Sequence, residues 1–128
     1  MGVAESRFGD AVDDNIVAIE GYSLIRQDRN TQGGGVVFYI KNNLRAKVLA
    51  RSNTTQKGKP TCIEYIKCRI SGKETPPIFV CVIYRPSYVP FDDDLQFLSN
   101  LRDLSSNYSH KIIMGDLNID MCAAILFL

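Results

Sequence analysis

Two short polar segments follow apolar runs of the sequence and carry side chains that could act on a phosphate. Tyr84-Arg85-Pro86 follows the run from Ile78 to Ile83, and Met114-Gly115-Asp116-Leu117-Asn118 follows Lys111-Ile112-Ile113. Asp116 and Asn118 are two residues apart, so their side chains project to the same face of an extended backbone. A carboxylate and a carboxamide beside a phenol suit a hard metal ion and a phosphate. The sequence therefore predicts a site where two buried strands end, the usual place for ligand chemistry in layered α/β folds.

Together with two further segments, these residues resemble a known family. Val82 to Pro86, Met114 to Asn118, and the run from Gly21 to Arg29 that leads to Gly33-Gly34-Gly35-Val36 look like motifs of the endonuclease/exonuclease/phosphatase superfamily. More narrowly, they resemble the apurinic-type endonuclease domain of non-LTR retrotransposons. Three motifs in the right order are a more specific signal than one short pattern.

The resemblance runs from about Val3 to Asp120 but covers only the middle of such a domain, and residues 121–128 match nothing. It implies an α/β fold: the core of a two-sheet α/β sandwich with helices outside, incomplete, in a single partial domain spanning residues 1–128. Its implied function is that of a fragment of a metal-dependent DNA endonuclease, a phosphodiester hydrolase of retrotransposon origin. Mg²⁺ or Mn²⁺ is the implied cofactor, and DNA is the partner of the intact family.

The resemblance also assigns roles to four residues of this chain. Glu5 falls where the family has its metal-binding glutamate, and Tyr84 matches the tyrosine that touches the scissile phosphate. Asp116 matches the aspartate that orients or deprotonates the attacking water. Asn118 matches the asparagine that hydrogen-bonds the phosphate in the transition state. Each residue also has a plainer interpretation, in which Glu5 is an exposed terminal residue and Tyr84 is a core aromatic at a strand end.

Two further residues near these motifs leave alternatives open. Arg85 could contact a phosphate oxygen or cover the sheet with its aliphatic stem. Glu64 alternates with Cys62 and Ile66 on one strand face, which makes it a candidate to support the site from behind. An ordinary glutamate facing the sheet edge is the interpretation we favour.

Part of the family's catalytic arrangement has no counterpart in this sequence. The family pattern begins with a strand that carries an asparagine and closes with a Ser-Asp-His motif, and neither is present. The only histidine, His110, starts the strand whose far end holds Asp116, about 20 Å away at 3.3 Å per residue. We therefore expect this polypeptide to be inactive by itself. The alternatives are a non-catalytic domesticated or decayed copy, at most a nucleic-acid or protein binding module, and an unrelated α/β interaction domain.

Hydrophobic periodicity predicts the elements that must position these residues. The expected helix runs from Asp92 to Asn107, with leucines at 95, 98, 101 and 104 spaced for an amphipathic face. Its three leading aspartates, Asp92 to Asp94, are expected to cap the helix rather than bind a metal, because consecutive residues point in different directions. The expected strands are Ile16 to Ile19, Tyr22 to Arg26, Val36 to Ile40, Thr61 to Ile70, Ile78 to Tyr84 and Lys111 to Ile113.

Two turn signals connect these strands. Gly33-Gly34-Gly35 lacks the Lys-Ser/Thr of a P-loop, so a hairpin turn is a better interpretation than a phosphate cradle. Ser71 to Pro77 is a polar connection, which favours an antiparallel pairing of the strands that flank it. Both faces of Val36 to Ile40 are apolar, so this strand should be covered on both sides.

Composition narrows the class of protein. At 128 residues with 45% hydrophobic content, the chain has room for one globular domain. A net charge of +1 does not fit a protein that holds DNA by charge alone, so any contact would be local to the more basic N-terminal half. That half contains Arg26, Arg29, Lys41, Arg45, Lys47 and Arg51, which an ordinary solvated sheet edge would equally explain.

The cysteines and the termini bear on compartment and association. Cys62, Cys68, Cys81 and Cys122 lack zinc-ligand spacing, and reduced structural thiols fit a nuclear or cytoplasmic, non-secreted protein. No membrane-spanning segment is visible, so no membrane partner is expected. Exposed sheet edges and the apolar tail after Asp120 predict self-association and marginal stability.

Overall fold

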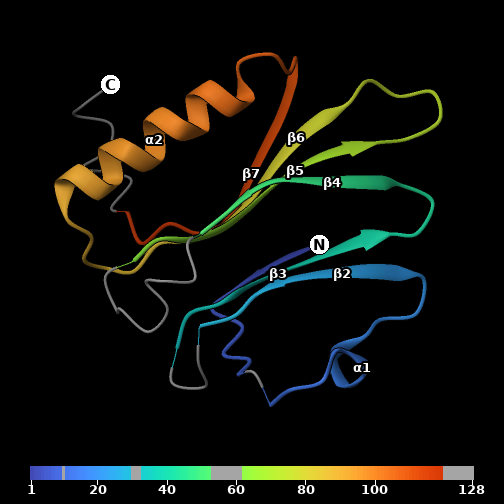
Figure 1. The fold of residues 1–128 in the computed structure, drawn as a ribbon, viewed down its shortest axis with the longest axis horizontal. Coiled ribbons are helices and arrows are strands. Elements are labelled where there is room, and N and C mark those ends of the chain that lie inside the picture. The colour runs from blue at the N-terminus through green and yellow to red at the C-terminus, as the bar shows by residue number, and fades with distance from the viewer. Residues whose placement is uncertain (10, 30–32, 53–61, 120–128) are drawn as a thin grey trace.

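The structure is a computed structural model that describes residues 1–9, 11–29, 33–52 and 62–119. In chain order its elements are β1 (Gly2–Ala4), α1 (Asp14–Val17), β2 (Tyr22–Gln27), β3 (Val36–Lys41), β4 (Arg45–Arg51), β5 (Glu64–Ser71), β6 (Ile78–Tyr84), α2 (Phe91–Ser105) and β7 (His110–Asp116). They form two sheets that face each other, with α2 on the outer side of one sheet (Figure 1).

The strand order explains how the ends of distant segments meet. One sheet has the order β1-β3-β2 and is antiparallel. The other has the order β4-β5-β6-β7, in which β6 and β7 are parallel and the remaining pairs are antiparallel. Helix α2 is the crossover that parallel neighbours require. The expected antiparallel pairing across the Ser71 to Pro77 connection is confirmed, as is the β2–β3 hairpin that the three glycines close.

Two apolar layers lie on the two faces of the β4–β7 sheet. The layer between the sheets consists of Val36, Phe38, Ile40, Ile66, Cys68, Ile70, Val80, Val82 and Tyr84. The layer beneath α2 consists of Ile63, Phe79, Cys81, Ile83, Val89, Phe97 and Leu101. Strand β6 is therefore a continuous apolar run, because both of its faces are covered.

Strand β3 is covered on both faces, as its sequence predicts. Val36 to Ile40 are all buried, and three of them pack against the other sheet. On the opposite face, the Tyr39 hydroxyl donates a hydrogen bond of 2.7 Å to the Val17 carbonyl at the end of α1.

The strand expected at Ile16 to Ile19 is wrong. Residues 14–17 form the short helix α1, in which Asp13 is the N-cap and its carboxylate accepts the Asn15 N–H at 2.8 Å. An aspartate at this position satisfies a free N–H of the first turn, which favours the helix over an extended chain. The apolar side chain of Ile16 is exposed rather than part of a sheet.

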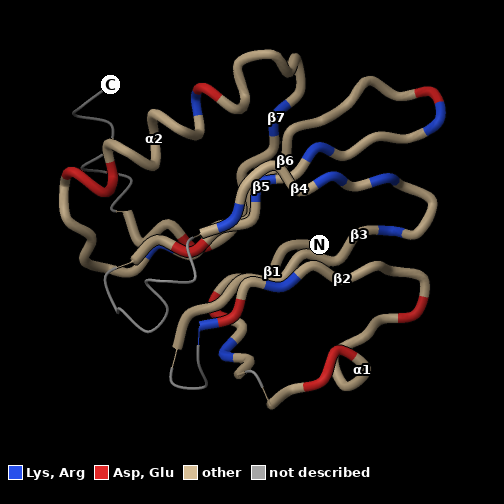
Figure 2. The backbone as a smooth tube through the Cα atoms, viewed as in Figure 1, with Lys and Arg blue, Asp and Glu red and all other residues tan. Residues whose placement is uncertain are grey.

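Strand β4 was not expected from the sequence, because its charged residues hide its periodicity. Arg45, Lys47 and Arg51 are exposed along the outer edge of the sheet (Figure 2). Val48 packs between the sheets and Leu49 under α2, as neighbouring strand residues point to opposite faces, and a register shift follows between Val48 and Ala50. Lysine and arginine on an edge strand discourage pairing with other chains, which supports the solvated-edge interpretation of these basic residues.

Helix α2 is confirmed at nearly the expected bounds, but its buried stripe differs from the leucine pattern. Phe97 and Leu101 are buried, whereas Leu95 and Leu98 are 49% and 56% exposed. The helix therefore contacts the sheet through positions 97, 101 and 104, an i, i+4, i+7 stripe. The expected side-chain cap from Asp92 to Asp94 is wrong, since Pro90 is the N-cap and no side chain caps the helix.

Asp94 instead binds Arg85 of the loop after β6. Arg85 Nε and Nη2 lie 2.8 and 2.7 Å from the two Asp94 carboxylate oxygens, and both side chains are largely buried. The hydrogen bonds and the charge of Asp94 raise the pKa of Arg85, and burial opposes this shift only in part. Arg85 is therefore committed to an intramolecular ion pair, and neither of its two sequence-based interpretations describes this contact.

We expect this pair to couple the helix to the site. In a double-mutant cycle of Arg85→Met and Asp94→Asn, the coupling energy should be about 1 to 2 kcal/mol, because charge-assisted bidentate hydrogen bonds outweigh exposed ion pairs. Urea unfolding followed by far-UV circular dichroism measures it. The exposed Arg102–Asp103 pair, 3.6 Å apart, is the control and should give almost no coupling. Equal coupling in the two cycles would contradict this expectation.

The three described cysteines form no disulfide, and two of them, Cys68 and Cys81, lie in the apolar layers. Burial raises the pKa of Cys68 to about 11 and that of Cys81 to about 12, so both remain protonated thiols at neutral pH. Cys122 and the rest of the tail lie outside the described residues.

Strand β7 occupies one edge of its sheet, and Ile112 and Ile113 are 44% and 49% exposed on it. Self-association through this edge stays a prediction.

Across the described part of the chain, no helix is long and apolar enough to cross a membrane.

Candidate active site

Three strand ends meet at one end of the two facing sheets. Strand β6 ends at Tyr84 and β7 at Asp116, and these two residues are register partners. Strand β1 lies against both, since a Cβ atom on Gly2 would be 2.5 Å from Met114 Sδ and 3.1 Å from Val82 Cγ1. Glu5 follows β1 directly. The topology therefore brings the carboxylates of Glu5 and Asp116 to the neighbourhood of one phenol.

Burial and the charges that surround Tyr84 contribute to a raised pKa of its phenol. Burial raises the pKa of the phenol, and the negative charges of Glu5, Asp116 and Glu64 raise it further, while the positive charge of Arg29 lowers it. Tyr84 is 9% exposed and stays protonated at neutral pH. A neutral phenol can donate a hydrogen bond to an anionic oxygen, whereas a phenolate would repel it.

Asp116 and Asn118 are held by a local turn. The Asn118 N–H donates to Asp116 Oδ1 at 3.0 Å, and the Asn118 amide Nδ2 donates to the Arg85 carbonyl at 2.8 Å. The Arg85 N–H donates to the Asp116 carbonyl, also at 2.8 Å. Asn118 has a φ of +45°, in the left-handed region that asparagine tolerates better than most residues. These bonds orient the Asp116 carboxylate and tie the two polar segments found in the sequence to each other.

Glu5 lies in a strained segment that the glycine turn supports. Glu5 and Arg7 have φ values of +54° and +56°, which are uncommon for residues with a side chain. The N–H groups of Ser6 and Arg7 donate to the carbonyls of Gly35 and Gly34 at 3.1 and 2.9 Å. Left-handed residues outside glycine cluster where function or packing holds them. The backbone of Glu5 is thus held in place, while its side chain, paired with Arg7, remains partly exposed.

The donor set can be compared with what a divalent cation needs. Glu5 and Asp116 offer hard carboxylate oxygens, and Mg²⁺ often binds through one or two carboxylates while it keeps several waters. Among the described residues, no group of three or more His, Cys, Asp or Glu side chains lies close enough together to hold a metal. The described residues therefore offer no closed site made of protein ligands alone, and an ion held through Glu5 would keep most of its water ligands.

Arg7 competes with any such ion for Glu5. Its Nη2 lies 2.9 Å from Glu5 Oε1, in an exposed ion pair. We expect Arg7→Ala to raise the affinity for Mn²⁺ by about two- to fivefold, the range implied by the strength of exposed ion pairs. Electron paramagnetic resonance of free Mn²⁺ during a titration measures this affinity. Arg102→Ala, which removes an equally exposed arginine from α2, should leave it unchanged, and a weakened affinity in Arg7→Ala would contradict the competition.

Glu64 and Arg29 form a buried part of the site, where the sequence analysis favoured an edge-facing glutamate over a supporting one. Glu64 is 7% exposed, so the edge-facing interpretation is wrong. Its carboxylate accepts the Gly35 N–H and lies 3.4 Å from Arg29 Nε. Burial raises the pKa of Glu64, although the Gly35 hydrogen bond and the charge of Arg29 oppose the shift. Its alternation with Ile66, which packs between the sheets, was the available signal that Glu64 points inward.

Arg26 and Arg29, two of the basic residues of the N-terminal half, are already engaged within the protein. Arg26 pairs with Asp28 at 2.6 Å and with Asp14 at 2.7 Å. Arg29 donates to the Gly33 carbonyl at 2.9 Å, and its guanidinium carbon lies 5.8 Å from the centre of the Tyr84 ring. His110 is exposed at the start of β7, at the opposite end of the strand from Asp116, as expected.

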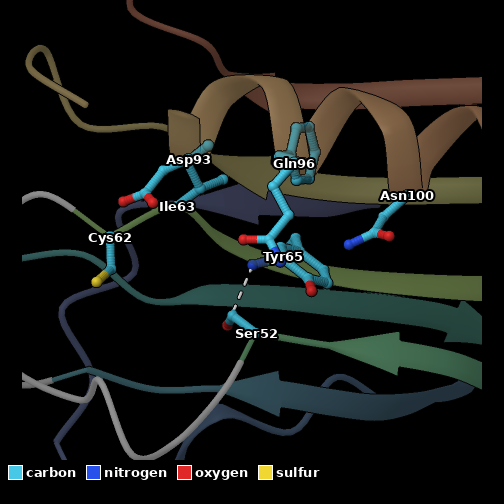
Figure 3. A pocket seen from close by; sticks show the side chains of 8 residues that line it. Ser52, Cys62, Ile63, Tyr65, Asp93, Gln96 and Asn100 are labelled. Carbon is cyan, nitrogen blue, oxygen red and sulfur yellow. Dashed lines mark hydrogen bonds between the residues drawn. The ribbon is translucent and has the colours of Figure 1, made fainter. Parts of the chain in front are cut away.

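A separate cavity lies on the other face of the β4–β7 sheet. It has a volume of about 270 Å³, and its lining includes Ser52, Cys62, Tyr65, Asp93, Gln96 and Asn100 (Figure 3). The Tyr65 N–H donates to Ser52 Oγ at 3.3 Å within it. The cavity opens beneath α2, whereas Glu64 and Tyr84 face the other sheet, so it is not part of the candidate site.

Comparisons with known proteins support the fold. No protein family and no curated protein matches the sequence. Among solved structures, the chain is similar to the human nocturnin catalytic domain with bound sulfate anion, at 14% identity and a TM-score of 0.61. The alignment covers 93% of this chain and 51% of the nocturnin chain, so this chain spans about half the length of that neighbour. The expected two-sheet α/β sandwich is therefore confirmed as the fold of this chain, and the nocturnin catalytic domain shares it.

Proposed function

We propose that this chain carries the metal-binding and phosphate-binding side of a phosphodiester-cleaving nuclease site, of the retrotransposon endonuclease type that acts on DNA. The observation that carries the proposal is the convergence of Glu5, Tyr84 and Asp116 where β1, β6 and β7 end. Both carboxylates act on the same buried phenol. The fold shared with the nocturnin catalytic domain is consistent with it.

The roles follow from the contacts of each side chain. Tyr84, kept neutral by its raised pKa, donates a hydrogen bond to a phosphate oxygen. Asp116, oriented by the Asn118 N–H, accepts a proton from or aligns the attacking water. Asn118 donates to the phosphate through the amide hydrogen that does not bind the Arg85 carbonyl. A Mg²⁺ ion held through Glu5 would polarise the phosphate.

We propose further that turnover by the 128-residue polypeptide is too slow to measure. Its only histidine lies at the far end of β7, so no imidazole can neutralise charge at the phosphate. Removing one such electrostatic donor typically lowers the rate by about a hundredfold or more. The polypeptide should bind a divalent cation without nicking DNA.

A second candidate function is a non-catalytic nucleic-acid binding module. The observation in its favour is the exposed row of Lys41, Arg45 and Lys47 from the β3–β4 turn along β4 (Figure 2). Such a row can contact a phosphate backbone, and binding through it would weaken steeply with salt.

Terbium luminescence separates the two candidates. Tb³⁺ prefers oxygen ligands and emits when a nearby tyrosine is excited, and the chain has no tryptophan to confuse the signal. We expect saturable emission that is reduced by about tenfold in Glu5→Gln and in Tyr84→Phe, and that is unchanged in the exposed variant Glu74→Gln. A plasmid-nicking assay with Mg²⁺ or Mn²⁺, run beside Asp116→Ala, completes the test.

Each outcome supports or contradicts a defined part of the proposal. Terbium binding that depends on Glu5, without nicking, supports both parts. Nicking that disappears in Asp116→Ala supports the nuclease assignment and contradicts inactivity, whereas nicking that persists in it comes from a contaminant. The second candidate is supported by two results together. Terbium emission is unchanged in Glu5→Gln, and DNA binding is salt-sensitive and lost in the double variant Arg45→Ala/Lys47→Ala.

A further inference from the structure

Glu64 is buried at the point where the two sheets meet the candidate site. It is the first residue of β5 and the register partner of Tyr84. It shares the inward face of β5 with Ile66 and Cys68. A carboxylate in such surroundings needs partners, because an unpaired buried charge is strongly unfavourable.

The two oxygens of this carboxylate serve two different segments. Oε2 accepts the Gly35 N–H of the glycine turn, and Oε1 lies 3.4 Å from Arg29 Nε. The approach is close: a Cβ atom on Gly34 would lie 2.5 Å from Glu64 Oε2 and would overlap the Arg29 guanidinium. Gly34 and Gly35 have φ values of +74° and +87°, so glycine is needed both for the space and for the backbone.

Through the glycine turn, Glu64 acts on Glu5. The carbonyls of Gly35 and Gly34 accept the N–H groups of Ser6 and Arg7, the two residues that follow Glu5. A Cβ atom on Gly35 would lie 2.6 Å from Ser6 Oγ, so there is no room for a side chain between the turn and this segment. The left-handed conformation of Glu5 persists only where its surroundings hold it, and these hydrogen bonds do so.

Through Arg29, Glu64 acts on Tyr84. The guanidinium carbon lies 5.8 Å from the centre of the Tyr84 ring, and the side chain of Arg29 is mostly buried. Arginine stacked near an aromatic ring is attracted to the face of that ring, and the attraction grows when water is excluded. The Gly33 carbonyl, 2.9 Å from Arg29 Nε, and the Glu64 carboxylate together fix where this guanidinium lies, and Glu64 supplies the negative charge that keeps it beside the ring.

We propose that Glu64 is the positioning residue of the candidate site: one buried carboxylate that holds both the glycine turn behind Glu5 and the arginine against Tyr84, and so fixes these two functional side chains relative to each other. The inference rests on the proposed function for the meaning of that spacing. Glu64 would touch neither metal nor phosphate, because both of its oxygens already have partners.

Three variants test the proposal on the full chain. Glu64→Ala removes both contacts, Glu64→Gln keeps an acceptor for the Gly35 N–H but loses the charge opposite Arg29, and Arg29→Met keeps an apolar stem beside Tyr84. Residues that orient a metal ligand typically contribute about 10- to 100-fold in metal affinity. We expect Glu64→Ala to lower the Tb³⁺ affinity by about that factor, Glu64→Gln to restore part of it, and Glu74→Ala, which removes an exposed carboxylate, to leave it unchanged.

A second readout does not depend on metal. In NMR spectra without Tb³⁺, Glu64→Ala should move the Gly35 amide and the Tyr84 ring resonances together. Arg29→Met should move the Tyr84 ring and affect the Gly35 amide little. Glu64→Gln, which replaces the charged acceptor of the Gly35 N–H by a neutral one, should move the Gly35 amide less than Glu64→Ala does. Resonances of Lys47 and other exposed positions on β4 report that the fold is intact.

The outcomes separate failure of this inference from failure of the proposed function. If Glu5→Gln abolishes Tb³⁺ binding while Glu64→Ala does not, the metal site stands and the positioning role is overturned. If wild-type protein gives no emission that depends on Glu5, the proposed function fails, and coupled shifts at Gly35 and Tyr84 still support the positioning role. Independent shifts of these two resonances in Glu64→Ala would overturn it.

Discussion

Gly115→Ala is expected to be the most damaging single substitution in this chain, leaving little or no folded protein. Gly115 has a φ of +133°, a conformation that residues with a side chain rarely adopt. An added Cβ would overlap the Ile83 carbonyl oxygen and lie 2.9 Å from the Ile83 carbonyl carbon. The neighbouring strand cannot retreat, because β6 is held between β5 and β7.

The size of this effect follows from two costs that add. Backbone strain of this kind costs about 1 to 3 kcal/mol, and overpacking adds a similar amount. Their sum, about 2 to 6 kcal/mol, reaches the lower end of the stability of a small domain, about 5 to 15 kcal/mol, where a chain of marginal stability would lie. Urea unfolding by far-UV circular dichroism should show no native baseline for Gly115→Ala.

Gly21→Ala is the matched control for the backbone part of this cost. Gly21 also has a positive φ, +83°, but a Cβ there would meet nothing within 4 Å. It should destabilise the chain by only about 1 kcal/mol. Equal unfolding midpoints for the two variants would show that the contact with Ile83 relaxes and would contradict the prediction.

Lys67→Met is expected to stabilise the protein at neutral pH. Lys67 is fully buried beneath α2, with its Nζ 4.3 Å from the centre of the Tyr65 ring and 4.7 Å from that of Phe97. Among the described residues, this Nζ has no hydrogen-bond partner. The attraction between the ammonium group and the two rings stabilises the folded state by about 2 kcal/mol. Burying the ammonium group costs several kcal/mol, which is more. Methionine fills the same volume without charge, so the free energy of unfolding should rise by about 1 to 3 kcal/mol.

The gain should depend on pH in one direction. Burial lowers the pKa of Lys67 below its ordinary 10.5, and the nearby Cys81 only partly opposes the shift. Between the lowered pKa and 10.5 the unfolded chain binds more protons than the folded chain, so the wild-type protein gains stability as pH rises through that window. The advantage of Lys67→Met is therefore largest at neutral pH and narrows as pH approaches 10.5.

Urea titrations of both proteins at a series of pH values measure this difference. Lys47→Met, at an exposed position on β4, is the control and should show no such narrowing. A Lys67→Met protein less stable than wild type at pH 7 would mean that the two rings compensate the buried charge fully.

Much of the fold could be predicted from the sequence because its strongest signals are local. Alternating or continuous apolar runs predicted β3, β5, β6 and α2, and polar residues at the ends of two runs predicted where β6 and β7 leave the core. The error at α1 arose from the same kind of reasoning, since a short apolar stretch fits either element and the capping Asp13 was not weighed. Strand β4 was missed because an edge strand needs few apolar residues.

In the candidate site, too, the features that could be predicted are local ones. Residue types and spacing were enough to select Tyr84, Asp116 and Asn118 at the ends of two apolar runs, whereas Glu5 was selected only by the family resemblance. The roles of all four residues stay predictions. The partners of Arg85 and Glu64 could not be predicted from their neighbours in sequence, although alternation with Ile66 indicated that Glu64 points inward. The partner of Arg85 lies nine residues away on α2, and the partners of Glu64 lie in the connection between β2 and β3.

The sequence by itself determined the strand ends, the glycine turn and the residues that could act on a phosphate, because periodicity, turn chemistry and side-chain type are properties of short segments. Only the tertiary structure decided which charges are paired and which carboxylate is buried. Desolvation and ion pairing depend on groups brought together from distant parts of the chain, as Glu64 is with Arg29 and Gly35 across the two sheets. No local pattern encodes that environment.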